Sequence, residues 1–259
     1  MSRQARIIAI ANQKGGVGKT TTAVNTAVGL AQLKHRVLLV DLDPQGNATM
    51  ACGIDSRTLD ISACELLLSE CRATEAIIDA ESIDVIGANT DLTAAELQLM
   101  DDDNPQQALK HQLAEVADDY DYILIDCPPS LSILTINALT AADSVLIPMQ
   151  CEYYALEGLT SLLDTIKRVQ QSVNPDLQIE GLLRTMFDGR NNLANDVAAQ
   201  ISEHFGDKVF TTVVPRNVKV AEAPSFGQSA IEYDMLSRGA VAYKGLASEI
   251  IRRHHGRTQ

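Results

Sequence analysis

The chain has 259 residues, and its 21 Lys and Arg against 34 Asp and Glu give a formal net charge of −13. An apolar content of 46% with 21% charged residues is ordinary for a soluble globular protein and excludes wholesale disorder, and no apolar run reaches the roughly 20 residues of a membrane span. Five Cys without a C-x-x-C pair argue against a disulfide framework or a zinc site, and 4% aromatic residues without Trp argue against a stacking platform for single-stranded nucleic acid.

Apolar, β-branched runs alternate with helical patterns along the chain. The runs that predict strands are residues 6–11, 35–42, 83–86, 122–126, 144–148, 179–185 and 209–214. The segments that predict helices are residues 19–33, 91–101, 105–117, 131–141, 156–172, 191–205 and 236–253. Continuous apolar strands separated by helices indicate a mostly parallel sheet with helices on both faces. We therefore expect one doubly wound α/β domain over residues 1–259.

A glycine-rich segment follows the first predicted strand and opens the first predicted helix. Glycines let the backbone wrap a phosphate with its N–H groups, and a helix N-terminus adds a favourable dipole. Lys19 would reach the β- and γ-phosphates of a nucleotide, and the Thr20 hydroxyl would ligate Mg²⁺. The usual pattern G-x-x-x-x-G-K-[ST] begins with Gly, whereas this chain has Gln13 there and a second lysine, Lys14, directly after it. The other predicted contacts of this phosphate loop are Gly15, Gly16, Val17, Gly18 and Thr21.

Carboxylates end two further predicted strands, at the edge where an open α/β sheet binds its ligands. Asp126 ends the run ILID, and a strand-end carboxylate near a phosphate loop is typical of a residue on the Mg²⁺ side of the site. The alternative is that such an Asp only caps the next helix. In the run DLDPQG, Asp43 is expected to orient or deprotonate the attacking water, and Asp41 would either act with Mg²⁺ or stabilise the loop.

Several runs carry a specific resemblance. KGGVGKTTT, DLDPQGNAT and DCPPSLSILTINAL resemble the P-loop ATPases with a deviant Walker A motif, a superfamily that includes MinD and the nitrogenase iron protein. PMQCEYYALEGL, GLLRTMFDGR and VVPRNVKVAEAPSFG narrow the resemblance to the ParA/Soj partition ATPases. The resemblance covers roughly residues 6–250 and is weakest over 52–120.

The resemblance implies an ATPase that uses ATP and Mg²⁺ and forms an ATP-dependent homodimer. In that family the lysine that matches Lys14 reaches the phosphates of the partner subunit, so Lys14 would bind ATP and take part in catalysis. The family's catalytic Asp matches Asp43, and its Walker B Asp matches Asp126. The adenine pocket is expected to involve Met186 and the segment Pro215-Arg216-Asn217.

The resemblance also implies binding of double-stranded DNA without sequence preference. Arg190 and Lys219 match the family's DNA-contacting positions, and Arg216 and the pair Arg252-Arg253 would add to the basic surface. The charge distribution permits this, because residues 184–259 carry a net charge of +2 and residues 1–183 carry −15. A ParB-type centromere-binding protein would stimulate ATP hydrolysis. We expect a cytoplasmic protein that associates with the nucleoid.

Two features of the sequence distinguish it from other members of the superfamily. Few residues precede the first predicted strand, so no N-terminal helix-turn-helix domain is expected. The last predicted helix has Val241, Leu246, Ile250 and Ile251 on what would be one face, with no Phe or Trp to insert into a lipid surface. We therefore expect a core-packed helix and no membrane binding, and a MinD-like membrane- or cargo-positioning ATPase remains the alternative.

Two further alternatives stay open. An iron–sulfur protein would need cysteines of two subunits to hold a cluster, but Cys127 and Cys151 lack the expected glycine-rich setting and are interpreted as small buried apolar residues. A metabolic enzyme of the wider fold would need an acceptor site beside the γ-phosphate, and no acceptor motif is recognised.

Overall fold

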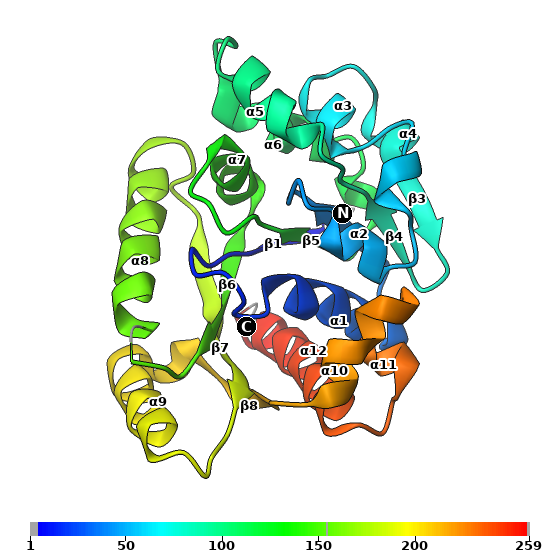
Figure 1. Cartoon of the computed structure of the whole chain (residues 1–259). Coiled ribbons are helices and arrows are strands. Elements are labelled where there is room, and N and C mark those ends of the chain that lie inside the picture. The colour runs from blue at the N-terminus through cyan, green and yellow to red at the C-terminus, as the bar shows by residue number, and fades with distance from the viewer. Residues whose placement is uncertain (1–4, 154, 258–259) are drawn as a thin grey trace.

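The computed structural model describes residues 5–153 and 155–257 as one eight-stranded sheet between two layers of helices (Figure 1). The strands lie in the order β3-β4-β2-β5-β1-β6-β7-β8. Their bounds are β1 Arg6–Ile10, β2 Val37–Asp41, β3 Ile77–Ala80, β4 Ile83–Ile86, β5 Tyr122–Asp126, β6 Ser144–Gln150, β7 Gln178–Phe187 and β8 Val209–Pro215. Neighbouring strands are parallel except β3 and β4, which form an antiparallel pair at one side. The mostly parallel, doubly wound α/β fold is therefore confirmed.

The helices agree with the predicted segments where these are long. The α-helices are α1 Lys19–Gln32, α2 Asn47–Ala51, α3 Ala63–Leu67, α4 Ala73–Ala76, α5 Leu92–Leu99, α6 Ala108–Leu113, α7 Ile133–Ala141, α8 Ala155–Ser172, α9 Asn192–Phe205, α10 Val218–Glu222, α11 Ala230–Tyr233 and α12 Arg238–Arg257. The expected continuous helix over 105–117 is wrong, because α6 is flanked by separate 3₁₀ turns. Strand β3 and the short helices α2, α3, α4, α10 and α11 were not predicted, since four or five residues are too few to show a period.

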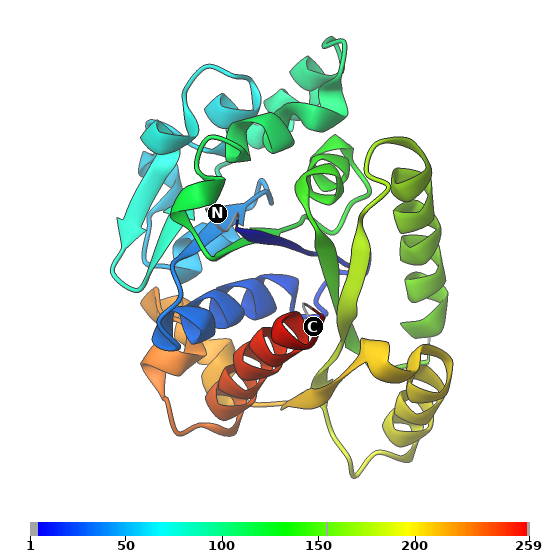
Figure 2. The same cartoon turned by 180° about the vertical axis from the view of Figure 1, so that it is seen from behind.

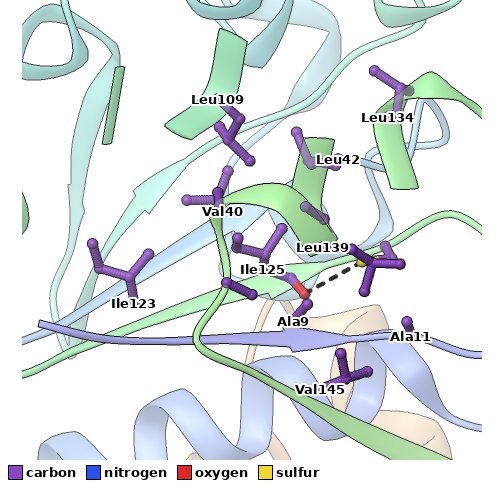
Figure 3. Packing of buried hydrophobic residues seen from close by; sticks show 14 of the residues in the cluster. Ala9, Ala11, Val40, Leu42, Leu109, Ile123, Ile125, Leu134, Leu139 and Val145 are labelled. Atoms are coloured by element: carbon purple, nitrogen blue, oxygen red, sulfur yellow. Dashed lines mark hydrogen bonds between the residues drawn. The ribbon is translucent and has the colours of Figure 1, made fainter. Parts of the chain in front are cut away.

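Alternate side chains of each strand enter two separate apolar cores. On one face, Ala9, Val40 and Ile125 pack with residues of α5 to α9, and Figure 3 shows this core from close by, with Leu109 and Leu134 from the helix layer. On the other face the strands pack against α1, α2, α11 and α12. Helices α1 and α12 lie side by side in both views of the molecule (Figure 2). Burial on both faces explains why the strands are continuously apolar.

The last helix, α12, is packed on the core as expected, where it contacts α1 and β8, but its buried face differs from the predicted one. Leu246 and Ile250 are fully buried, whereas Val241 is 55% exposed and Ile251 is only partly buried. The prediction that Val241 belongs to the core-facing side is therefore wrong. In the part of the chain that the structure describes, none of the helices combines the length and apolar composition of a membrane span.

Candidate functional site

A cavity of about 710 Å³ lies at the carboxyl edge of the sheet, which we define as the edge where the parallel strands end. Its lining residues come from the phosphate loop and α1, from the segments after β2 and β5, from the end of β7, and from a segment between β8 and α12. They are Gly15, Gly16, Gly18, Lys19, Thr20, Thr21, Val24, Asn25, Asp43, Gln45, Asn47, Met50, Ala51, Pro129, Met186, Pro224, Ser225, Gln228 and Ala230. The structure thus brings the phosphate loop and Asp43 together around one cavity large enough for a nucleotide.

The phosphate loop has the backbone that its glycines permit. Gly16 and Gly18 lie at φ +73° and +88°, a left-handed region that residues with a Cβ rarely adopt. Gly18 is the N-cap of α1, so the first N–H groups of this helix lie at the cavity. The Lys19 ammonium donates to the carbonyl of Lys14 at 3.4 Å, and burial lowers the pKa of Lys19 although the nearby Asp126 raises it. A helix N-terminus with a lysine at its start is suited to bind phosphates.

Two neighbouring carboxylates on the segment after β2 have different surroundings. Both oxygens of buried Asp41 accept hydrogen bonds, one from the Asp43 N–H at 3.0 Å and the other from the Thr49 N–H and hydroxyl at 2.9 and 2.7 Å. Burial raises the pKa of Asp41 to about 6, although these hydrogen bonds lower it. Asp43 lines the cavity. Within the described residues, the Gln45 N–H is the one group that donates a hydrogen bond to the Asp43 carboxylate. Of the two roles predicted for Asp41, its geometry favours stabilising the loop.

Asp126 ends β5 and is fully buried. Neither of its carboxylate oxygens has a hydrogen-bond partner of good geometry in the described residues, although the Thr20 hydroxyl is close enough to lower its pKa. Burial, with the charge of Asp41 as the next contribution, raises that pKa well above its usual value. A buried carboxylate without partners, next to a hydroxyl, is the oxygen donor set that Mg²⁺ prefers, so these residues fit the ion that the sequence predicts. The described residues contain no cluster of three or more His, Cys, Asp or Glu that would hold a metal by themselves.

Lys14 lies at the start of the phosphate loop, on its exposed side. Its ammonium forms an ion pair with Glu152 at 2.6 Å, and the Lys14 side chain is 37% exposed. The Lys14 N–H donates to the Asn12 side chain at 3.0 Å, and the Asn12 amide in turn donates to the carbonyl of Pro148 at 2.7 Å. The loop is thereby fixed to the end of β6, while the charged end of Lys14 stays accessible to solvent.

The predicted adenine pocket is only partly reproduced. Met186 lines the cavity with its backbone at φ +49°, a strained value for a residue with a side chain. Pro215 ends β8 and Asn217 caps α10 with its side chain, and neither belongs to the cavity lining. Pro224 and Ser225 line it instead. The sequence gives one indication of this position, because Pro224 belongs to the segment that follows the last predicted strand, and ligands bind where such strands end.

The basic residues predicted to bind DNA fall into two separate places. Arg190 follows β7 at the carboxyl edge, where its Nε and Nη2 donate to Asp188 at 2.9 and 2.7 Å while 91% of its side chain stays exposed. Arg190 lowers the pKa of Asp188 to about 2, and Arg216 adds to this shift, so Arg216 belongs to the same group of charges. Lys219 also lies after β8 and pairs with Glu222 at 3.1 Å.

Arg252 does not belong to that group. Its neighbour Arg253 donates to the carbonyl of Val209, the first residue of β8, at 2.9 Å. Arg216 follows the last residue of the same strand, and a strand of this length spans about 20 Å. The structure therefore does not bring Arg252 together with Arg190 and Arg216, and it does not support the predicted single basic surface.

Cys127 and Cys151 are buried, with 1% and 7% exposure. Burial raises the pKa of both thiols, and for Cys127 the charge of Asp126 adds to the shift. Protonated, buried thiols agree with the interpretation of both residues as small apolar side chains.

Comparisons with known proteins extend over nearly the whole chain. The family model described as an AAA domain matches residues 5–179. The sporulation initiation inhibitor protein Soj of Bacillus subtilis is 52% identical over 95% of this chain and 98% of its own. The chromosome partitioning protein ParA of Myxococcus xanthus is 51% identical over 96% of this chain and 88% of its own. Among solved structures, cobyrinic acid a,c-diamide synthase from Mycobacterium smegmatis with bound ADP and magnesium is 38% identical, with a TM-score of 0.86 and coverage of 97% and 96%.

Proposed function

The chain belongs to the family of the ParA and Soj chromosome-partitioning ATPases, and from this membership we propose that it is an ATP-dependent switch for the segregation or positioning of DNA. In this proposal ATP binding closes a homodimer, the dimer binds double-stranded DNA without sequence preference, and hydrolysis releases it. A ParB-type centromere-binding protein stimulates hydrolysis, and the ATP form is associated with the nucleoid.

The nucleotide chemistry follows from the groups around the cavity. The N–H groups at the start of α1 and the Lys19 ammonium bind and orient the phosphates. Thr20 and Asp126 would hold Mg²⁺, which would supply positive charge beside the phosphates. Asp43 lines the cavity together with Lys19, and within the described residues its carboxylate accepts a hydrogen bond from the Gln45 N–H alone. Its remaining lone pairs are therefore free to accept a proton from water or to orient it.

Lys14 supports the dimer part of the proposal. It lies beside the phosphate loop, yet its ammonium is directed away to Glu152 on the protein surface instead of into its own cavity. An accessible cation at that position would stabilise the phosphates of a second subunit across a two-fold interface, because a charge supplied by the partner makes ATP part of the interface.

The DNA part rests on Arg190, Arg216 and Lys219, which all follow the last two strands at the carboxyl edge. The observation that carries the proposal is the continuity of this segment with the nucleotide cavity. Met186 lines the cavity, and Arg190 lies four residues further along the same chain segment. A handful of such cations would give weak binding that depends steeply on salt, with a slope of about −0.9 in log–log form for each phosphate neutralised.

The experiment is binding of a random-sequence DNA duplex at low and moderate salt, without nucleotide, with ADP and with ATP, in the Asp43→Ala protein, which should bind ATP without hydrolysing it. We expect binding only with ATP, a steep loss with salt, and its abolition by Arg190→Ala, while dimerisation by ATP remains. The matched control is Arg57→Ala. Arg57 pairs with Asp55 in the same geometry as Arg190 with Asp188 and is 86% exposed, but it lies in a 3₁₀ turn after α2.

Two other results would overturn the proposal. Dimerisation by ATP without DNA binding in any state would favour the MinD-like alternative, which co-sedimentation with anionic lipid vesicles then tests. Turnover that responds to a small-molecule acceptor and not to DNA would favour a metabolic enzyme of the wider fold.

A further inference from the structure

Two side chains at the ends of β6 and β7 donate hydrogen bonds to carbonyl groups of the phosphate loop. The Thr185 hydroxyl, near the end of β7, donates to the Val17 carbonyl at 2.7 Å, and this hydrogen bond is buried. The Gln150 amide, at the end of β6, donates to the Gly16 carbonyl at 3.4 Å and to the Met186 sulfur at 2.9 Å. Two successive peptide groups of the loop are therefore anchored to the sheet through their oxygens.

Peptide geometry converts this anchoring into an orientation of the N–H groups. In a trans peptide the C=O of one residue and the N–H of the next point in opposite directions, and the described residues contain no cis peptide bond. When Thr185 fixes the Val17 carbonyl toward the sheet, the Gly18 N–H points the other way. Gly18 lines the cavity, and within the described residues its N–H donates to no protein acceptor. The buried hydrogen bond thus presents an unpaired donor to the place where the phosphates are expected.

We propose that Thr185 is a positioning residue for nucleotide binding, which holds the Val17–Gly18 peptide with its N–H directed at a phosphate oxygen. The role rests on the proposed ATP site, and Gln150 supports it at the preceding peptide through a longer hydrogen bond. Without the anchor, the peptide could turn its carbonyl oxygen toward the phosphates, which would repel them. A donor that is oriented before the ligand arrives spares the ligand the free energy of ordering the loop.

The environment of Thr185 suits this role. The residue is 2% exposed, and its Cβ and Cγ2 lie 3.9 Å from the place that a Cβ would occupy on Gly18. Its methyl group therefore packs against the loop while its hydroxyl holds the adjacent carbonyl. A β-branched side chain has few rotamers, so the hydroxyl is fixed in direction.

The test compares Thr185→Val, which keeps the shape and removes the hydroxyl, with Thr185→Ser, which keeps the hydroxyl. The control is Thr140→Val, because Thr140 is equally buried and its hydroxyl also donates to a carbonyl, that of Ile136 at 2.8 Å within α7. We measure the dissociation constant of ADP with Mg²⁺ by calorimetry and the midpoint of thermal unfolding without nucleotide. Thr185→Val should raise the dissociation constant roughly tenfold, as loss of one buried hydrogen bond predicts.

In this proposal Thr185→Ser restores the affinity to within about threefold, and Thr140→Val lowers the unfolding midpoint as much as Thr185→Val does but leaves ADP binding unchanged. Should Thr185→Val not fold, Thr185→Ala against Thr185→Ser makes the same comparison. Unchanged ADP affinity in Thr185→Val, or equal losses in Thr185→Ser and Thr185→Val, overturns the positioning role alone. No ADP binding by the wild-type protein overturns the proposed nucleotide site and this role with it.

Discussion

Two fully buried strand carboxylates, Asp126 at the carboxyl edge of the sheet and Glu180 at the amino edge, have opposite surroundings. At the carboxyl edge, fully buried Asp126 has no hydrogen-bond partner of good geometry in the described residues. At the amino edge, where the parallel strands begin, Glu180 is equally buried but accepts from the Ser144 hydroxyl at 2.8 Å and lies 3.5 and 3.2 Å from Arg6 and His254.

The amino edge repeats this arrangement at a second carboxylate. Glu249 of α12 accepts from the backbone of Thr211 and Thr212, both at 2.9 Å, and from Arg253 at 2.9 Å. Arg253 also lies 4.3 Å from the ring centre of Phe210, so its cation is paired and packed at once. Glu180 and Glu249 therefore each face donors and cations of the same chain, and Glu249 ties α12 to β8.

The difference shows where a ligand is needed. An unsatisfied buried polar group destabilises a protein by about 1–3 kcal/mol, so it persists where something outside the chain completes it. A buried carboxylate that faces donors and cations of its own chain instead fixes the packing of the elements. We therefore interpret the amino edge as structural and the carboxyl edge as the functional one.

The largest effect should come from breaking the paired cluster around Glu180. Glu180→Gln removes the charge that Arg6 and His254 face, and loss of one partner of a buried ion pair lowers the free energy of unfolding by about 3 kcal/mol. ADP affinity should stay within about twofold of wild type, because the cluster is at the far edge. Urea unfolding and ADP titration check both values, with the exposed Glu70→Gln as the control. A loss of ADP affinity at unchanged stability would contradict the division into two edges.

The same chemical change at the carboxyl edge should act in the opposite direction on stability. Asp126→Asn removes a buried carboxylate whose oxygens accept no hydrogen bond of good geometry in the described residues, so the nucleotide-free protein should gain about 1–2 kcal/mol in its free energy of unfolding at pH 8. ATP turnover with Mg²⁺ should fall at least about a hundredfold, since a group that holds the ion is lost. Steady-state phosphate release and urea unfolding are the two measurements. A destabilised variant with normal turnover would show that Asp126 is only structural.

The comparison also explains what the sequence could predict. The sheet, the phosphate loop and Asp43 were recognisable because each depends on residues adjacent in the chain: an apolar run, a glycine spacing, a strand end. The contact of Thr185 with Val17 joins residues 168 positions apart, and no local pattern encodes it. The path of the chain in space likewise decides which residues after the last predicted strand reach the cavity, namely Pro224 and Ser225 instead of Pro215 and Asn217. Asp126 and Glu180 are both carboxylates within apolar strand sequences. Their different roles follow only from the residues that surround each of them in the folded chain.

Acid should weaken the amino edge through Glu249. Burial alone would raise the pKa of Glu249, but the hydrogen bonds from Thr212, Thr211 and Arg253 outweigh it and lower the pKa below its ordinary value. A lowered carboxyl pKa stabilises the fold above the unfolded-state value of about 4.5, and this stabilisation is lost as the pH falls through the folded-state pKa.

The variant that tests this is Glu249→Gln, which should be about 1.5 kcal/mol less stable than wild type at pH 7 because its charge-assisted hydrogen bonds become neutral ones. The difference should shrink steadily below about pH 4.5 as the wild-type carboxyl takes up a proton. Urea unfolding at a series of pH values checks the trend. A difference that stays constant down to pH 3 would mean that the charge of Glu249 contributes nothing.

The smallest expected change in stability concerns backbone strain. A residue with a side chain adopts a positive φ at each edge of the sheet. Lys34 follows the C-terminus of α1 at φ +71°, and Met186 lies at φ +49° beside the nucleotide cavity. Glycine adopts this region without penalty, so Lys34→Gly should raise the free energy of unfolding by about 0.5–1 kcal/mol and leave ADP binding unchanged. Met186→Gly relieves similar strain but also removes a cavity wall and the sulfur that the Gln150 amide contacts, so its gain in stability should be smaller and its ADP affinity lower. Urea unfolding and ADP titration of both variants check this. If Met186→Gly bound ADP as well as wild type does, the strain at Met186 would be incidental, and the carboxyl edge would owe its function to its unpaired polar groups alone.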